Sequence, residues 1–212
     1  WKDIGFSPDG TVSGIGKGLL FGLVCSVFAY TVECIVLLFL HGNVHLSFYA
    51  SGFSLTNEKV SQVGILLILS SVLFNLINVW MEEGIFRGLF TKILEGLSYR
   101  KSLFFIAFLF GIWHLVMPLR DYLQGESSLV NLIAMGIGYV ILAGMMSIKW
   151  SLLYKMTGSL WFGLGDHFFN NLASNLVHVV SNSEADSLQI VRILLWQLLS
   201  FAIVLWVYQK KN

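Results

Sequence analysis

The sequence predicts an all-α, polytopic membrane protein, a bundle of about six transmembrane helices. Of its 212 residues, 56% are hydrophobic and only 12% are charged, and the mean hydropathy is +0.76. A chain of this composition is too apolar, and too poor in charge, for an ordinary soluble domain. The apolar residues also gather in runs that are long enough to cross a bilayer.

Polar breakers between these runs delimit the predicted helices. They cover residues 17–40, 61–97, 102–117, 129–156, 159–180 and 188–209. The second is longer than a span requires, so its end, with Lys92 and Glu95, is expected to leave the bilayer as an amphipathic piece. Pro118 is expected to end the third helix. No internal repeat is visible, and we expect one domain over residues 1–212.

The distribution of Lys and Arg predicts the orientation, because these residues favour the cytoplasmic side of a membrane. In the six-helix scheme only Lys59, Arg120 and Arg192 fall on the side opposite the termini. The side of the termini carries Lys2, Lys17, Lys92, Arg100, Lys101, Lys149, Lys155, Lys210 and Lys211. Both termini are therefore predicted to be cytoplasmic. The net charge of +1 and the lack of a basic run exclude nucleic acid as a partner.

Three charged residues interrupt the end of the second apolar run. Charges at such a position are costly and usually mark function. Glu83 and Arg87 are four residues apart, so on a helix they share a face and neutralise each other, whereas Glu82 points about 100° away. Gly84 and Gly88, beside the acids, are expected to permit a close approach of another helix. The spacing thus assigns Glu83 to support and leaves Glu82 for chemistry.

A hairpin brings a histidine to the same level. Glu82 lies 16 residues before Ser98, where the chain is expected to turn, and His114 lies 16 residues after it. Two antiparallel helices with the same rise per residue place these two side chains at one depth. The sequence therefore predicts that a carboxylate and an imidazole meet there.

The second polar concentration follows Gly165. His167 and Asn171 are spaced by one helical turn, and Asn175 and His178 are expected to continue the same stripe. A hydrogen-bonded seam between helices is the plainer interpretation of this stripe. A catalytic role is the alternative that the remaining motifs favour.

Other polar residues leave two interpretations open. Asn75 and Asn78 lie on the face that leads to Glu82, where they either bind substrate backbone or bond a neighbouring helix. Glu33, in the first helix, either lines a cavity or is protonated or bonded to another helix. His41 and His45 have a spacing that suits a metal, but solvated loop histidines are the commoner case.

Three motifs in order resemble the signatures of one family. Glu82-Glu83-x-x-x-Arg87, Phe110-Gly111-Ile112-Trp113-His114 and His167-x-x-x-Asn171 are similar to those of the CPBP family, the CAAX protease and bacteriocin-processing intramembrane proteases, also called Abi. The Gly158-Ser159-Leu160-Trp161 lead into the third motif resembles the family as well. The similar region spans roughly residues 60–180.

The resemblance implies a glutamate-dependent endopeptidase in the membrane of a bacterial cell. Glu82 and His114 would activate water, while His167 and Asn171 would stabilise the oxyanion, which needs preorganised donors. Apart from the family's motif roles, Trp113, Asn75 and Asn78 are candidates for contact with the substrate. The partners implied are the lipid bilayer and a peptide, either a prenylated CAAX-type C terminus or the leader of a bacteriocin or pheromone.

The sequence signatures of other protease classes are absent or incomplete. The His-Glu-x-x-His signature of helical zinc proteases and the Gly-x-Ser-x-Gly elbow are absent from the sequence. Gly163-Leu164-Gly165-Asp166 looks like a presenilin-type aspartyl signature, but that chemistry needs a second carboxylate, and the other aspartates fall in predicted tails or loops. A zinc ion held by Glu82, His114 and His167 would match a catalytic ligand set. Because water activated by Glu needs no ion, we expect no metal or other cofactor.

Two further classes of function remain open. The first is a membrane scaffold or bacteriocin self-immunity protein that keeps the fold without catalysis, for which loss of Glu82, His114 or His167 would be typical. None of these residues is lost. The second is a small transporter or channel, which would place a polar stripe along several helices rather than polar groups at one level.

Overall fold

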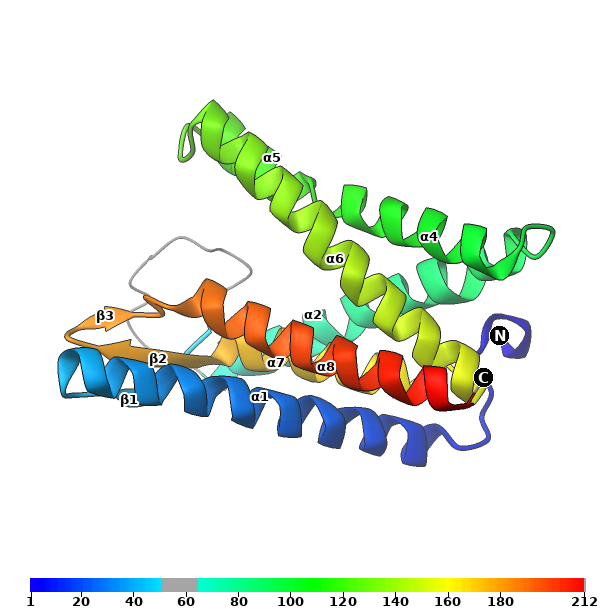
Figure 1. Ribbon diagram of the computed structural model, residues 1–212, viewed down its shortest axis with the longest axis horizontal. Coiled ribbons are helices and arrows are strands. Elements are labelled where there is room, and N and C mark those ends of the chain that lie inside the picture. Colours follow the sequence, from blue (N-terminus) through cyan, green and yellow to red (C-terminus); the bar gives the residue numbers. More distant parts are fainter. Residues whose placement is uncertain (51–64, 212) are drawn as a thin grey trace. The chain divides into compact units, whose positions relative to one another are not determined.

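The computed structural model describes residues 1–50 and 65–211, and helices dominate it (Figure 1). The elements are η1 (Lys2–Ile4), α1 (Thr11–His41), β1 (His45–Phe48), α2 (Ile65–Glu82), η2 (Glu83–Leu89), α3 (Phe90–Ile93), α4 (Tyr99–Trp113), α5 (Val116–Leu123), α6 (Leu129–Thr157), α7 (Trp161–Leu176), β2 (Val177–Ser181), β3 (Glu184–Ala185) and α8 (Gln189–Lys211). The prediction of an all-α, polytopic helix bundle is confirmed. The structure also contains a small β-sheet, which the sequence did not predict.

Five segments of the described chain are long and apolar enough to cross a membrane: Thr11–His41, Ile65–Ile93, Tyr99–Leu123, Leu129–Thr157 and Gln189–Lys211. Large apolar side chains on them are exposed, Leu66 by 76% and Ile141 by 67%. Lipid is the surrounding that such side chains require. The protein is an integral, multi-pass membrane protein.

The helix predicted over residues 159–180 is shorter than expected. As α7 it has 16 residues and a length of about 24 Å, less than the roughly 30 Å of a bilayer core. The prediction was wrong for residues 177–180, which belong to β2. Val177, Val179 and Val180 are β-branched residues that favour a strand, and β1 is there to pair with them.

Other helix ends also differ from the sequence prediction, and the first helix begins at Thr11 rather than at residue 17. The second helix stops at Ile93 rather than residue 97, and its predicted start, residues 61–64, lies outside the described residues. Pro118 does not end the third helix: α4 stops at Trp113, and Pro118 lies in the first turn of α5. Proline is tolerated in a first turn, because the N–H that it lacks has no partner within the helix there.

Internal packing divides the structure into two compact units. Unit 1 comprises Trp1–Asp9, Glu82–Leu160 and Phe201–Asn212, and unit 2 comprises Gly10–Met81 and Trp161–Ser200. The boundaries fall just before α1, within α2, between α6 and α7, and within α8. The single domain over residues 1–212 stays a prediction, because continuous helices run through both units.

In unit 2, α1 packs directly on α7. A Cβ atom added to Gly18 of α1 would lie 2.3 Å from the Phe162 carbonyl oxygen, and one added to Gly165 of α7 would lie 2.5 Å from the Ile15 carbonyl oxygen. These distances are far inside van der Waals contact, so only glycine permits this separation of the helices. Buried apolar side chains of α1, α7, β2 and α8 form the core of this unit. In it, Trp196 of α8 packs edge-on against Tyr30 of α1.

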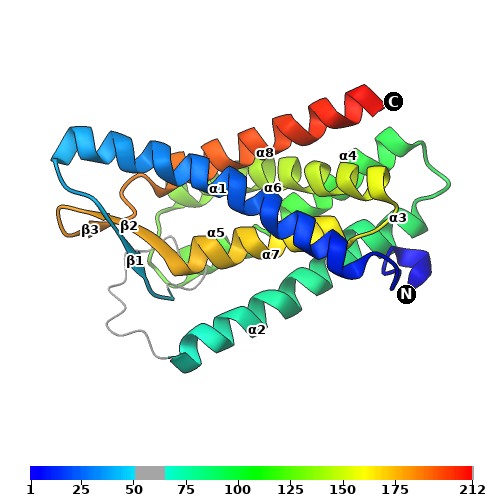
Figure 2. The ribbon, with the colours of Figure 1, turned by 90° about the horizontal axis from the view of Figure 1, so that it is seen from below.

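The three strands form one antiparallel sheet at the end of α1 that holds His41 (Figures 1 and 2). Its central strand is β2, with Val180 opposite His45 on one side and Ala185 on the other. His178, predicted to extend the polar stripe of the preceding helix, instead lies on β2. The interpretation of His178 as part of that stripe was therefore wrong.

In unit 1, α4 packs on α6 through another glycine. A Cβ atom at Gly111 would lie 2.8 Å from the Val140 carbonyl oxygen. Gly84 and Gly88 also permit a close approach, but their neighbour is the N-terminal segment rather than a membrane helix. A Cβ atom at Gly88 would lie 2.6 Å from the Ile4 carbonyl oxygen.

Candidate active site

Glu82 lies where the second membrane helix changes its winding. It is the last residue of α2, and the next seven residues form the π-helical segment η2, in which the N–H of Phe90 donates to the carbonyl of Ile85, five residues earlier. Only 4% of Glu82 is exposed. π-Helical turns are rare and occur frequently at functional sites. Sequence periodicity did not predict this segment, because it assumes a regular α-helical winding.

The predicted ion pair inside η2 is present. Arg87 Nη1 lies 3.4 Å from Glu83 Oε1, and both side chains are almost fully buried. A buried charge requires a partner of opposite sign, which each of these residues supplies to the other. Glu83 and Arg87 thus lie together, as predicted for supporting residues.

Arg87 is also held by aromatic rings that the sequence analysis did not connect with it. Its guanidinium carbon lies 4.0 Å from the centre of the Phe110 ring and 5.0 Å from that of Trp150. Stacking of this kind is favourable for a guanidinium that has lost its water. Phe110, four residues before His114 in the second motif, was the signal available for this contact. No pattern in the sequence indicated the contact with Trp150, which lies on α6.

The turn between α3 and α4 brings the second motif back to Glu82. Trp113 Nε1 donates a hydrogen bond of 3.0 Å to Glu82 Oε1, and Trp113 directly precedes His114. The end of α4 therefore reaches the level of Glu82, as equal spacing about Ser98 predicted. Trp113, predicted to contact substrate, has the carboxylate as its hydrogen-bond partner in this structure.

His114 lies at the C-cap of α4, and its ring is oriented by the preceding turn. Its Nδ1 atom is 2.8 Å from the carbonyl oxygen of Phe110. The centre of its ring lies 4.6 Å from the centre of the Phe110 ring. A carbonyl only accepts hydrogen bonds, so Nδ1 carries the proton in this contact. In the neutral ring, Nε2 is then the nitrogen that can accept a proton or bind water.

His167 and Asn171 belong to unit 2. Both lie on α7, one turn apart as predicted; His167 is buried and Asn171 is half-buried. The backbone contact of Gly165 with α1 fixes the helix two residues before His167. Asp166, from the aspartyl-type motif, is fully buried on the same helix. Each unit thus carries a share of the predicted catalytic residues, with Glu82, Trp113 and His114 in unit 1.

The two asparagines of α2 differ in their surroundings. Asn75 is buried, its Nδ2 donates to the carbonyl of Ser71 at 2.8 Å, and its Oδ1 accepts from Asn175 Nδ2 at 3.5 Å. Asn75 therefore bonds a neighbouring helix, which is one of the two roles considered for it from the sequence. Asn78 is half-buried. Contact of either side chain with a substrate remains a prediction.

A second buried charge cluster joins the sheet of unit 2 to its helices. Arg192 of α8 donates to Glu33 Oε2 at 2.7 Å and to Asp186 Oδ1 at 2.9 Å, while Asp186 Oδ2 lies 2.5 Å from Nδ1 of His178. Glu33 is thus bonded to a neighbouring helix. Burial raises the pKa of Asp186, but its contacts with His178 and Arg192 lower it more, and the net pKa is below the usual value.

The Tyr49 ring stacks on His178 in the same cluster, with the ring centres 3.8 Å apart. Burial raises the pKa of the Tyr49 hydroxyl. The cluster therefore involves residues from β2, from the connections of the sheet and from two helices. Sequence patterns placed Glu33 and Arg192 in their helices and Asp186 in a loop, but they put His178 in a helix and did not connect these residues.

Comparison with known proteins gives a family for this chain. The model of the family described as type II CAAX prenyl endopeptidase Rce1-like matches residues 64–173, which is more than half of the 212 residues. Neither the curated proteins nor the solved structures contain a match. The matched range includes all three motifs, so the resemblance to CAAX proteases is confirmed. The chain belongs to the type II CAAX prenyl endopeptidase Rce1-like family.

Proposed function

We propose that this protein is an intramembrane endopeptidase in which Glu82 and His114 activate water to hydrolyse a peptide bond of a membrane-associated peptide. One observation supports it above the others. A buried carboxylate at a π-helical segment is oriented by the N–H of Trp113, the neighbour of His114. An ionisable group so placed in a membrane span suggests chemistry rather than architecture.

The proposed reaction begins with proton transfer from water to Glu82. The oxygen of that water attacks the carbonyl carbon of the scissile bond, and the carbonyl oxygen becomes an oxyanion. Trp113 keeps the Glu82 carboxylate in one orientation by donating to Oε1. His114, with Nδ1 bonded to the Phe110 carbonyl, presents Nε2 to the water. The C–N bond then breaks as the proton taken from water passes to the leaving amine.

The proposal assigns oxyanion stabilisation to His167 and Asn171. The imidazole N–H and the amide N–H₂ are donors suited to developing negative charge. Glu83 and Arg87 complete the assignment as supporting residues, because their buried pair fixes η2 directly after Glu82. No metal ion is required, since the carboxylate itself takes the proton.

We further propose a prenylated CAAX-type C terminus as the first substrate class to test. The family description names a CAAX prenyl endopeptidase, and a prenylated peptide is held at the membrane by its own lipid. Leader segments of bacteriocins or pheromones form the second class, because they too are peptides presented at a membrane.

The test is cleavage of a farnesylated CAAX peptide, and then of a leader peptide, by purified full-length protein in detergent. We expect Glu82→Gln and His114→Ala to lower kcat by about 10²- to 10⁴-fold, the usual contribution of general acid–base catalysis. Glu95→Gln is the matched control, since Glu95 is an exposed glutamate that pairs with Lys92. Thermal unfolding checks that each variant is folded.

Full cleavage by folded Glu82→Gln would overturn the glutamate mechanism. A chelator arm separates the metal alternative, because loss of activity on chelation and its recovery with zinc would assign the chemistry to a metal ion. If the wild-type protein, folded and membrane-inserted, cleaves neither peptide class, the non-catalytic scaffold or immunity role replaces the protease proposal.

A further inference from the structure

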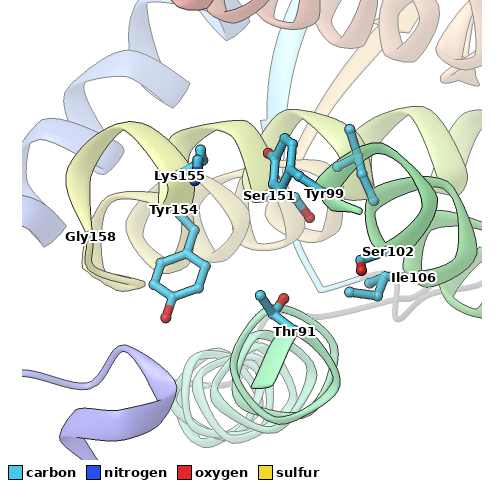
Figure 3. A pocket seen from close by; sticks show the side chains of 9 residues that line it. Thr91, Tyr99, Ser102, Ile106, Ser151, Tyr154, Lys155 and Gly158 are labelled. Atoms are coloured by element: carbon cyan, nitrogen blue, oxygen red, sulfur yellow. The ribbon is translucent and has the colours of Figure 1, made fainter. Parts of the chain in front are cut away.

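A pocket in unit 1 lies outside the catalytic residues. It has a volume of about 270 Å³ and is formed by α3, α4 and α6 (Figure 3). Figure 3 shows Thr91 rising from α3 and Tyr154 descending from α6 on facing sides, with Ser102 beside them on α4. The polar side chains that line it are Thr91, Tyr99, Ser102, Ser151, Tyr154 and Lys155.

Two hydroxyls of this pocket are buried and have no hydrogen-bond partner among the residues that the structure describes. They are Oη of Tyr99 and Oγ of Ser151, and the Ser151 residue as a whole is only 7% exposed. Buried polar groups in native proteins are almost always bonded, and an exception requires an explanation. A ligand that accepts hydrogen bonds would satisfy both hydroxyls.

The charge around the pocket selects an anion. Lys155 Nζ lies 5.1 Å from the centre of the Tyr99 ring, at the wall of the pocket. Arg100 and Lys101, both exposed, follow Tyr99 in the first turn of α4. Two acids lie near Lys92 of α3: Glu95 pairs with its ammonium at 2.7 Å, and Asp3 interacts with it from the N-terminal segment. The N-terminal end of α4, which has no side-chain bond from its N-cap Ser98, attracts negative charge. The C-terminal end of α6 has the opposite polarity, and Lys155 in its last turn offsets that polarity.

The position and size of the pocket favour a lipid headgroup. Its residues lie at the start of the span Tyr99–Leu123 and at the end of the span Leu129–Thr157, hence at the level where headgroups lie. Its volume is below the about 300–1,000 Å³ typical of pockets for drug-sized ligands. The pocket is also distinct from the active site, since 15 residues of helix, or about 22 Å, separate Tyr99 from His114.

We propose that this pocket binds a phosphate group, carried by the headgroup of an anionic glycerophospholipid. Ser151 and Tyr99 donate their hydroxyl protons to the phosphate oxygens, and Lys155 supplies the balancing charge. A soluble phosphate ester offers the same chemistry and is the alternative source of the ligand. The proposal does not rest on the proteolytic activity of the protein.

The test measures lipid binding by purified full-length protein in detergent, using native mass spectrometry. The ligands are phosphatidylglycerol, diacylglycerol with the same acyl chains but no phosphate, and soluble glycerol 1-phosphate. We expect the affinity for phosphatidylglycerol to fall at least about tenfold in the double variant Tyr99→Phe, Lys155→Gln, which loses a hydroxyl donor and a charge. Lys210→Gln, which removes an exposed lysine outside the pocket, is the matched control.

Ser151→Ala, a substitution that deletes only the buried hydroxyl, is a second test should the double variant fail to fold. Weaker binding of phosphatidylglycerol by either folded variant, with diacylglycerol unaffected, supports the proposal. If glycerol 1-phosphate binds with the same dependence while the lipid does not, the phosphate site stands and its ligand is soluble. Equal binding of phosphatidylglycerol and diacylglycerol, without binding of glycerol 1-phosphate, would overturn it, as would equal affinities in wild type and folded variants.

Discussion

At the scale of the residue, two adjacent glutamates have different surroundings. Glu83 lies against the buried guanidinium of Arg87, whereas Glu82 accepts a hydrogen bond from the neutral indole of Trp113. The bond from Trp113 holds one oxygen of Glu82 in place, whereas the ion pair holds Glu83 within the π-helical segment. These contacts fit the roles proposed for the two residues, with Glu82 acting on water and Glu83 supporting η2.

Trp113→Phe tests this orientation, because it keeps an aromatic ring but removes the donor to Glu82. We expect kcat for cleavage of the substrate peptide to fall about tenfold, the effect of one hydrogen bond to a charged group. KM should remain unchanged if Trp113 acts only by positioning the carboxylate. Steady-state kinetics on the purified protein gives both constants.

Trp206→Phe is the control for the loss of an indole, since Trp206 is 56% exposed. A rise in KM at constant kcat would contradict the positioning role of Trp113. That result would instead favour the substrate contact predicted for it from the sequence.

Helical spacing predicted part of this site. The separation of four residues gave the pair of Glu83 and Arg87, and equal distances from Ser98 gave the common level of Glu82 and the second motif. The stacking of Arg87 against Trp150 was not predictable, because it joins residues 63 positions apart on helices whose faces the sequence does not match. The π-helical winding of η2 was missed because periodicity arguments assume a regular helix.

At the scale of the element, the packing of α1 on α7 depends on a series of glycines. Gly14, Gly18 and Gly22 recur every four residues on α1, and a Cβ atom on any of them would approach an atom of Trp161, Phe162 or Phe169 within 3 Å. This spacing is visible in the sequence and was the available signal for the contact. The helix that carries His167 and Asn171 is thus positioned by backbone contact.

Gly18→Ala should separate α1 from α7, since the added carbon would lie 2.3 Å from the Phe162 carbonyl oxygen. We expect a loss of about 1–3 kcal/mol in the free energy of unfolding, typical of overpacking. Gly16→Ala is the matched control on the same helix, because its added carbon would have no atom of another described element within 4 Å. Alanine there should stabilise by up to about 1 kcal/mol through helix propensity. Denaturation in detergent measures both; equal effects of the two substitutions would contradict the close contact.

The sheet and its charge cluster form the other element of unit 2 that the sequence did not predict. Strand pairing of β2 with β1 joins residues more than 120 positions apart, so local periodicity carried no sign of it. Asp186 bonds both His178 and Arg192 and also accepts from the backbone N–H of Val179 at 3.1 Å. Through these bonds Asp186 connects β2 of the sheet with α8.

The stability of unit 2 should therefore fall in acid. Because the pKa of Asp186 is lower in the folded protein than in the unfolded chain, its contribution is fully present above about pH 4, the pKa of a free aspartate. The contribution is lost as the pH falls from there through the folded pKa. Thermal unfolding between pH 6 and pH 3 should show a smaller acid-induced decrease for Asp186→Asn than for wild type. Asp9→Asn, which alters an exposed aspartate, should behave as wild type, and an identical decrease in all three proteins would contradict this role.

At the scale of the whole molecule, the number of membrane crossings depends on α7, which is too short to qualify as a span by itself. Contacts within unit 2 show that α7 and β2 together follow α1 along its length. At the start of α7, Trp161 packs against Gly14 of α1. Farther along, Tyr30 of α1 donates to the carbonyl of Val177, and Ser181 of β2 donates to the carbonyl of Asn43, just after α1. The chain therefore advances parallel to α1, first as a helix and then as a strand, and α8 returns, with Arg192 at Glu33.

This path predicts an even number of crossings, with the segment before α1 and the end of α8 on the same side of the membrane. The excess of Lys and Arg on that side predicts that it is the cytoplasm. Single cysteines at Lys2 and Lys211, in a background with Cys25→Ala and Cys34→Ala, should both be protected from a membrane-impermeant maleimide in intact cells. Cysteines at Glu126 and Asn182, which lie in connections at the opposite end in this scheme, should both react. If α7 and β2 did not complete a crossing, Lys2 and Lys211 would lie on opposite sides, and only one of these two cysteines would be labelled.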